Sequence, residues 1–126
     1  MWKGTIFRCR GGHKEVAEYL LANNADVNAE NEEGWTPLHM AAENNHDLIA
    51  ELLLANKANV NARSNDGSTP LLLAAFKGGT DLGELLLDHG ANVNDKDNKY
   101  GYTALRWATD QHHEDMADML RQHGGQ

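Results

Sequence analysis

The stretch Thr36-Pro37-Leu38-His39-Met40-Ala41-Ala42 decides the fold, because it returns along the chain at a regular interval. The chain reads Thr69-Pro70-Leu71 after 33 residues, and Thr103 and Leu105 occupy the same places 34 residues further on. The longer second interval reflects one residue inserted near Asp97. A fixed period of this length indicates an architecture in which similar units stack beside one another.

Each copy of this stretch predicts two short helices. The threonine that opens each copy can cap the first helix, which we expect to end near residue 44, 77 or 111. Asn45 and Gly78 favour the left-handed backbone that ends such a helix. Apolar residues spaced i, i+3 and i+4, such as Ile49 with Leu52-Leu53-Leu54, predict a second helix with a buried stripe. Because no copy can bury both of its faces alone, the copies must stack.

The Thr36–Ala42 stretch, followed by His46, Leu52-Leu53-Leu54 and Ala58-Asn59-Val60-Asn61-Ala62, resembles the ankyrin repeat. The resemblance covers essentially the whole chain and implies an all-α solenoid of stacked helix–turn–helix pairs with projecting hairpin loops. It implies one domain over residues 1–126, with repeats at about 1–30, 31–63, 64–97 and 98–126. In the family, the hairpin tips and the first helices form a concave surface that binds other proteins.

The end copies depart from the pattern. Copy one has Lys3-Gly4-Thr5-Ile6-Phe7-Arg8-Cys9 at the deciding stretch, so we expect an incomplete repeat whose first helix is frayed or absent. In the last copy, Arg121 replaces a leucine, which predicts a cap-like repeat with a polar outer face. Lys57 stands where Asn24 and Gly90 stand in other copies, and we expect it to strain that helix end.

Composition narrows the classes of function. The 126 residues include 19 acidic and 11 basic ones, a formal net charge of −8 that disfavours nucleic-acid and anionic-membrane binding. No apolar run approaches the ~20 residues of a transmembrane helix, and no signal peptide is visible, so we expect a cytoplasmic or nuclear protein. The single cysteine, Cys9, excludes an intrachain disulfide.

The candidate catalytic and metal-binding groups each have a simpler explanation. His39 and His46 belong to the repeat pattern, and we expect them to hydrogen-bond locally. Cys9 and His13 could form a nucleophilic pair, but Cys9 more simply replaces a small alanine of the repeat. The histidines and acids of residues 110–114 lack the spacing of a metal site. We therefore expect no enzymatic activity, no cofactor and no metal.

Transferring the family's partner-facing positions to this chain gives fifteen candidate residues for binding another protein. Aromatic side chains in the set are common interface anchors. Acidic residues outnumber basic ones, which favours a partner with a basic patch. Trp2 and Arg10 would join the set if copy one is ordered. The fifteen candidates are Glu32, Glu33, Trp35, Glu43, Asn44, Asn65, Asp66, Ser68, Phe76, Lys77, Lys99, Tyr100, Tyr102, Asp110 and Gln111.

Three aromatic residues carry separate expectations. Phe76 is an apolar ring at a position that Glu43 and Asp110 hold in other copies, so the repeat itself does not require it. Trp35 serves equally well as an interface anchor or as a packing residue against the adjacent hairpin. Trp107 stands where other copies have methionine or leucine, and we expect it in the core.

Asn28, Asn61 and Asn94 recur eight residues after a leucine of the second helix. Their placement resembles the pattern by which an asparaginyl hydroxylase modifies many ankyrin repeats. The alternative is that these side chains simply hydrogen-bond across the hairpins.

These observations favour a non-enzymatic protein–protein interaction module that binds a partner through its concave face, as a monomer. Two alternatives remain open. One is an engineered or reconstructed repeat scaffold with no specific natural partner. The other, more remote, is a regulatory fragment of a larger enzyme.

Overall fold

The computed structural model describes residues 27–125, which contain six helices in three consecutive pairs and no strand. The first pair is α3 (Pro37–Glu43) and α4 (Asp47–Ala55), and the second is α5 (Pro70–Lys77) and α6 (Thr80–Asp88). The third pair is α7 (Ala104–Asp110) and α8 (Glu114–Gln122). The prediction of two short helices per copy is therefore confirmed for these three copies.

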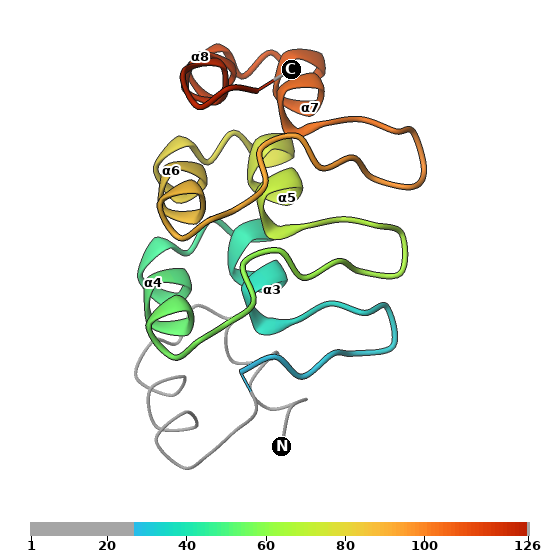
Figure 1. Cartoon of the computed structure of the whole chain (residues 1–126), viewed down its shortest axis with the longest axis vertical. Coiled ribbons are helices and arrows are strands. Elements are labelled where there is room, and N and C mark those ends of the chain that lie inside the picture. Colours follow the sequence, from blue (N-terminus) through green and yellow to red (C-terminus); the bar gives the residue numbers. More distant parts are fainter. Residues whose placement is uncertain (1–26, 126) are drawn as a thin grey trace.

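The pairs stack in a regular order. Helices α3, α5 and α7 form one column and helices α4, α6 and α8 form a second column beside it (Figure 1). The segments that lead into α5 and α7 run across to the first column and project beyond it as hairpin loops (Figure 1). This is the all-α solenoid with projecting hairpins that the sequence predicts.

The expectations for copy one fall outside the described residues. They are the frayed first helix, the pair formed by Cys9 and His13, and the places of Trp2 and Arg10 at the interface.

Threonine caps start the first helix of every described pair, as predicted. The Thr36 hydroxyl accepts a hydrogen bond from the His39 amide, and Thr69 and Thr103 accept from the amides three residues ahead in the same way. Pro37 occupies the first helical position, where its missing N–H leaves no bond unmade. Short polar side chains thus set where α3, α5 and α7 begin.

Left-handed residues end the first helices. The predicted residues Asn45 and Gly78 have φ angles of 55° and 76°, and His112 takes the same place in the last copy with φ 62°. Only His112 was missed, because histidine signals such a turn less clearly than glycine or asparagine. Lys57, after α4, also lies in the left-handed region with φ 72°, where a side chain is strained as predicted.

The core lies between the two columns and between successive pairs. Leu53 and Leu86 are fully buried on α4 and α6, which confirms the predicted stripe. Ala41 and Ala74 are fully buried on α3 and α5. The pairs approach so closely that a Cβ on Gly83 would lie 2.5 Å from a methionine methyl group of α8. Small residues in the helices make this stacking distance possible.

Asparagine side chains join neighbouring copies along the edge where the second helices end. Asn28 accepts from the Asn59 amide at 2.7 Å and donates to the Lys57 carbonyl at 3.3 Å. Asn61 repeats both bonds with the next copy, accepting from the Asn92 amide at 2.8 Å. The hairpin-bridging role proposed for these asparagines is therefore present, and their hydroxylation stays a prediction.

His39 joins α3 to the next hairpin. Its ring Nε2 lies 2.8 Å from the Ser68 carbonyl, and its Nδ1 lies 3.1 Å from the Thr36 amide. A carbonyl only accepts, so Nε2 carries the proton and Nδ1 accepts from the amide N–H. Burial lowers the pKa of His39, against the smaller opposing effect of its bond to Ser68. The imidazole is therefore held neutral.

The lowered pKa of His39 predicts an acid-sensitive contribution to stability. Below the ordinary pKa of 6.5 the unfolded chain binds a proton that the folded chain resists, so this contribution is full above that pH and is lost on acidification. We expect the stability difference between the wild type and His39→Gln to shrink from pH 7 to pH 5 in urea unfolding. The exposed His123→Gln serves as control. A difference that stays constant over this range contradicts the account.

Removing a leucine from the stacked stripe should destabilise the fold. Leu53→Ala and Leu86→Ala each leave a cavity between helices, and we expect each to lower the free energy of unfolding by about 2–5 kcal/mol. Urea unfolding followed by far-UV circular dichroism measures this change. Glu51→Ala and Glu84→Ala, exposed on the same helices, are matched controls expected within about 0.5 kcal/mol of wild type. Equal stabilities across all four variants would show that the stripe is not the core.

Candidate functional site

The fifteen candidate binding residues all lie in the described part of the chain, and none of them is buried. They occupy the projecting segments before α3, α5 and α7, or the C-terminal ends of these three helices. These elements lie on the same side of the stack (Figure 1). The structure therefore brings the candidates onto one side, which we call the hairpin face.

Some candidates have structural tasks within this face. Asn65 joins two successive hairpins, because its amide donates to the Glu33 carbonyl and its side chain donates to the Glu32 carbonyl, both at 2.9 Å. Asn44 caps α3 by donating from its side chain to the Met40 carbonyl at 2.9 Å. These bonds account for both asparagines without a partner protein.

Trp35 packs on its own copy. Its ring stacks on His39, with 5.9 Å between the ring centroids and 24° between the planes. The indole is half-buried, so one part holds the buried histidine in place and the rest faces solvent. Trp35 is thus a packing residue, but its partner is the imidazole of α3 and not the adjacent hairpin, and its role as an interface anchor stays a prediction.

Four aromatic rings gather where the third and fourth copies meet. Trp107 is the centre of this aromatic cluster, with Phe76, Tyr100 and Tyr102 around it at centroid distances of 5.3, 5.8 and 5.1 Å. All three contacts are edge-on arrangements, which aromatic quadrupoles favour. Phe76 is 38 % exposed and Tyr100 is 56 % exposed, so much of the cluster remains open to solvent.

Trp107 differs from its expected place in the core. It packs against the core but stays half-buried, and its Nε1 donates to Asp97 Oδ2 at 2.8 Å. An indole N–H needs an acceptor when it leaves water, and the hairpin next to Trp107 supplies one. Trp107 therefore belongs to the hairpin face, which reasoning from the repeat position alone missed.

Asp97 organises the hairpin that carries the two tyrosines. Its Oδ1 accepts from the Tyr100 and Tyr102 amides at 2.9 and 3.3 Å, and the residue is only 8 % exposed. Asn31 has the same task before α3, where it accepts from the Trp35 amide at 3.0 Å. Each of these two hairpins thus has a short polar residue at the same repeat position, and this recurrence in the sequence could have revealed the structural role of Asp97.

A groove of about 300 Å³ lies beside the aromatic cluster and reaches across the third and fourth copies. Its walls combine aromatic rings, two leucines and two carboxylates. The lining residues are Asp66, Ser68, Leu72, Leu73, Phe76, Asp97, Lys99, Tyr100 and Trp107.

Asp66 provides a fixed negative charge at this groove. Its Oδ1 accepts from the Ser64 hydroxyl and from the Ser68 amide. The hydrogen bond from Ser64 is the largest cause that lowers the pKa of Asp66, and Ser68 adds to it. The carboxylate therefore stays ionised at neutral pH.

Cationic side chains of the chain itself lie against these rings. The Arg106 guanidinium carbon lies 4.4 Å from the centroid of Tyr102, and its Nε is 3.4 Å from Asp110 Oδ1. The ammonium groups of Lys99 and Lys77 lie 5.3 and 5.7 Å from the ring centroids of Tyr100 and Phe76. The cluster thus attracts positive charge.

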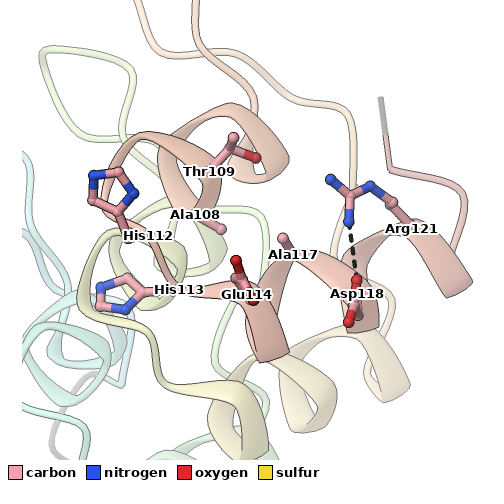
Figure 2. A pocket seen from close by; sticks show the side chains of 8 residues that line it. All are labelled: Ala108, Thr109, His112, His113, Glu114, Ala117, Asp118 and Arg121. Atoms are coloured by element: carbon pink, nitrogen blue, oxygen red, sulfur yellow. Dashed lines mark hydrogen bonds and ion pairs between the residues drawn. The ribbon is translucent and has the colours of Figure 1, made fainter.

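A second cavity of about 260 Å³ lies between α7 and α8 (Figure 2). Arg121, which lines this cavity, pairs with Asp118 at 3.0 Å, and both side chains are exposed, which gives the last copy the polar outer face that was predicted (Figure 2). His113 Nε2 lies 3.1 Å from the Phe76 carbonyl, a hydrogen bond that joins the last copy to the one before it. Within residues 27–125, no three histidine, cysteine or acidic side chains are placed to hold a metal ion.

Comparison with known proteins identifies the repeats. A family model described as ankyrin repeats (3 copies) matches residues 5–64 and again residues 56–126. No curated protein matched the chain. In the part of the chain that the structure describes, no helix is both long and apolar enough to cross a membrane.

Removing the carboxylate of Asp97 should loosen the hairpin and the cluster together. Asp97→Ala leaves the Trp107 indole N–H without its acceptor and removes two bonds to backbone amides. We expect a loss of about 1–3 kcal/mol in urea unfolding and a shift of the Trp107 indole signal in NMR spectra. Lys96→Ala, an exposed neighbour on the same hairpin, should change neither. An unshifted indole signal in Asp97→Ala would refute the bond.

Proposed function

Because the chain belongs to the ankyrin repeat family, whose repeats are generally protein–protein interaction modules, we propose that it binds a partner protein through its hairpin face. In this proposal the face is the concave surface formed by hairpin tips and first helices. The exposed aromatic cluster at the third and fourth copies carries the proposal. Exposed rings beside a groove are typical of binding anchors, since a partner gains energy by covering them.

The charge of the face supports a partner with a basic patch. The candidate set contains five carboxylates, of Glu32, Glu33, Glu43, Asp66 and Asp110, against the ammonium groups of Lys77 and Lys99. A net negative surface speeds encounter with a positive one and disfavours acidic partners. The same charge argues against nucleic acid as the partner.

A non-enzymatic role fits the environment of His39, the histidine of the deciding stretch. Both ring nitrogens of the buried His39 are engaged, Nε2 by the Ser68 carbonyl and Nδ1 by the Thr36 amide. A catalytic base needs a free ring nitrogen within reach of a substrate. We therefore propose binding without catalysis or cofactor, by a monomeric chain.

The proposal predicts that substitutions of aromatic residues on the hairpin face weaken partner binding and that substitutions on the second column of helices do not. A partner is captured from cell lysate, identified by mass spectrometry, and titrated against purified variants. We expect Phe76→Ala and Tyr102→Ala to weaken binding by at least about 2 kcal/mol, because a few anchors carry most of an interface's energy. Their melting temperatures should fall far less than their affinities, because both rings are partly exposed and a substitution in a solenoid has little effect on distant copies.

The controls lie on the second column of helices. Glu51→Ala and Glu84→Ala are exposed on α4 and α6, away from the hairpin face, and should leave affinity unchanged. If these two variants abolish binding and the aromatic variants do not, the partner uses another surface. If no variant changes any interaction, the alternative of a scaffold without a specific partner is favoured.

A further inference from the structure

The rings that line the groove meet at steep angles. Phe76 stands at 83° and Tyr100 at 72° to the plane of Trp107, so both rings meet the indole edge to face. All three rings line the same groove, although they come from α5, from a hairpin and from α7. The face of an aromatic ring carries negative electrostatic potential, which favours a cation in a groove lined by such rings.

The two carboxylates of the groove differ in what they can still bind. Both oxygens of Asp97 are engaged, by the indole N–H and by two backbone amides. At Asp66 the bonds from the Ser64 hydroxyl and the Ser68 amide both end on Oδ1, and the residue is exposed, so its carboxylate still faces solvent. Asp66 is therefore the carboxylate that can pair with an incoming cation.

The chain shows how a guanidinium is held at this cluster. Arg106 stacks on Tyr102 and also contacts the Asp110 carboxylate and the Tyr102 hydroxyl, each at 3.4 Å. One aromatic face and one carboxylate thus hold an arginine on the Tyr102 side of Trp107. The groove offers the same two elements, aromatic faces and the Asp66 carboxylate, to a side chain from outside.

We propose that this groove receives an arginine side chain of the partner protein, stacked against the aromatic rings and paired with Asp66. The inference rests on the proposed function, because it names the residue that the hairpin face recognises. Arginine fits better than lysine, since its flat guanidinium stacks on rings and presents several donors to a carboxylate. Leu72 and Leu73 line the groove where the aliphatic stem of the arginine would lie.

Lys99 opposes the arginine. It lines the groove, and its ammonium group lies 5.3 Å from the ring centroid of Tyr100. A cation that enters must displace this lysine and overcome its charge. Lys99→Ala should therefore tighten the binding of a cation, an effect that a purely structural role of Lys99 does not produce.

The test uses short peptides with the full chain. Acetyl-Gly-Gly-Arg-Gly-Gly-amide is titrated in NMR experiments, against the same peptide with lysine and with citrulline, the uncharged isostere of arginine. We expect the arginine peptide to shift the Trp107 indole and Leu73 amide signals saturably. The citrulline peptide should bind at least tenfold more weakly, and the lysine peptide several-fold more weakly. Asp66→Asn should weaken arginine binding about tenfold.

Two variants guard against indirect effects. Asp66→Asn keeps a side-chain oxygen for Ser64, and its NMR spectrum shows whether the fold is intact. Glu84→Gln removes an exposed carboxylate of α6 that belongs neither to the hairpin face nor to the groove, and it should leave peptide binding unchanged. Lys99→Ala should strengthen binding of the arginine peptide several-fold.

The outcomes separate this inference from the function on which it rests. Equal binding of the arginine and citrulline peptides, shifts centred away from Trp107, or an unchanged affinity in Asp66→Asn would each overturn the arginine site. If Phe76→Ala still abolishes binding of the captured partner, the hairpin face remains the binding surface and only the arginine inference fails. If neither peptide nor partner responds to these residues, both proposals fail.

Discussion

The structure depends on burial between neighbouring copies. Each pair of helices has two apolar sides, and only a pair above or below can cover the second one. The fully buried alanines of α3 and α5 let the helices approach, and the leucines Leu53 and Leu86 fill the space between the columns. Polar links follow the same direction, since His39 bonds to Ser68 and Asn28 bonds to the Asn59 amide in the next copy. The packing of each copy on the next thus sets the spacing of the helices and the direction in which the hairpins project.

Much of this order is legible in the sequence because it is local. A threonine at the N-cap position accepts a hydrogen bond from the amide three residues ahead, and the leucine spacing marks the buried side of the second helix. The resemblance to a known repeat then placed the fifteen candidates on one face. The left-handed backbone of His112 was harder to predict, because histidine signals such a turn less clearly than glycine or asparagine does.

The aromatic cluster shows where reasoning from the repeat reaches its limit. Trp107 occupies a core position by analogy with its counterparts, yet its indole N–H bonds to Asp97 on a hairpin that carries an inserted residue. That bond joins residues ten positions apart, and no pattern within one copy contains it. Phe76 was recognised as unusual, but its contact with Trp107 depends on how the third copy meets the fourth. The part of the face that differs from the repeat is therefore the part proposed to select a partner.

The central claim is that a partner covers the hairpin face at the third and fourth copies. Hydrogen exchange of the free chain and of its complex, compared peptide by peptide, tests it most directly. The account predicts slower exchange on binding over residues 64–77 and 97–107, which carry the groove and the aromatic cluster, with exchange in α4 and α6 unchanged. Slower exchange confined to α4, α6 and α8 would place the partner on the second column of helices and contradict the account.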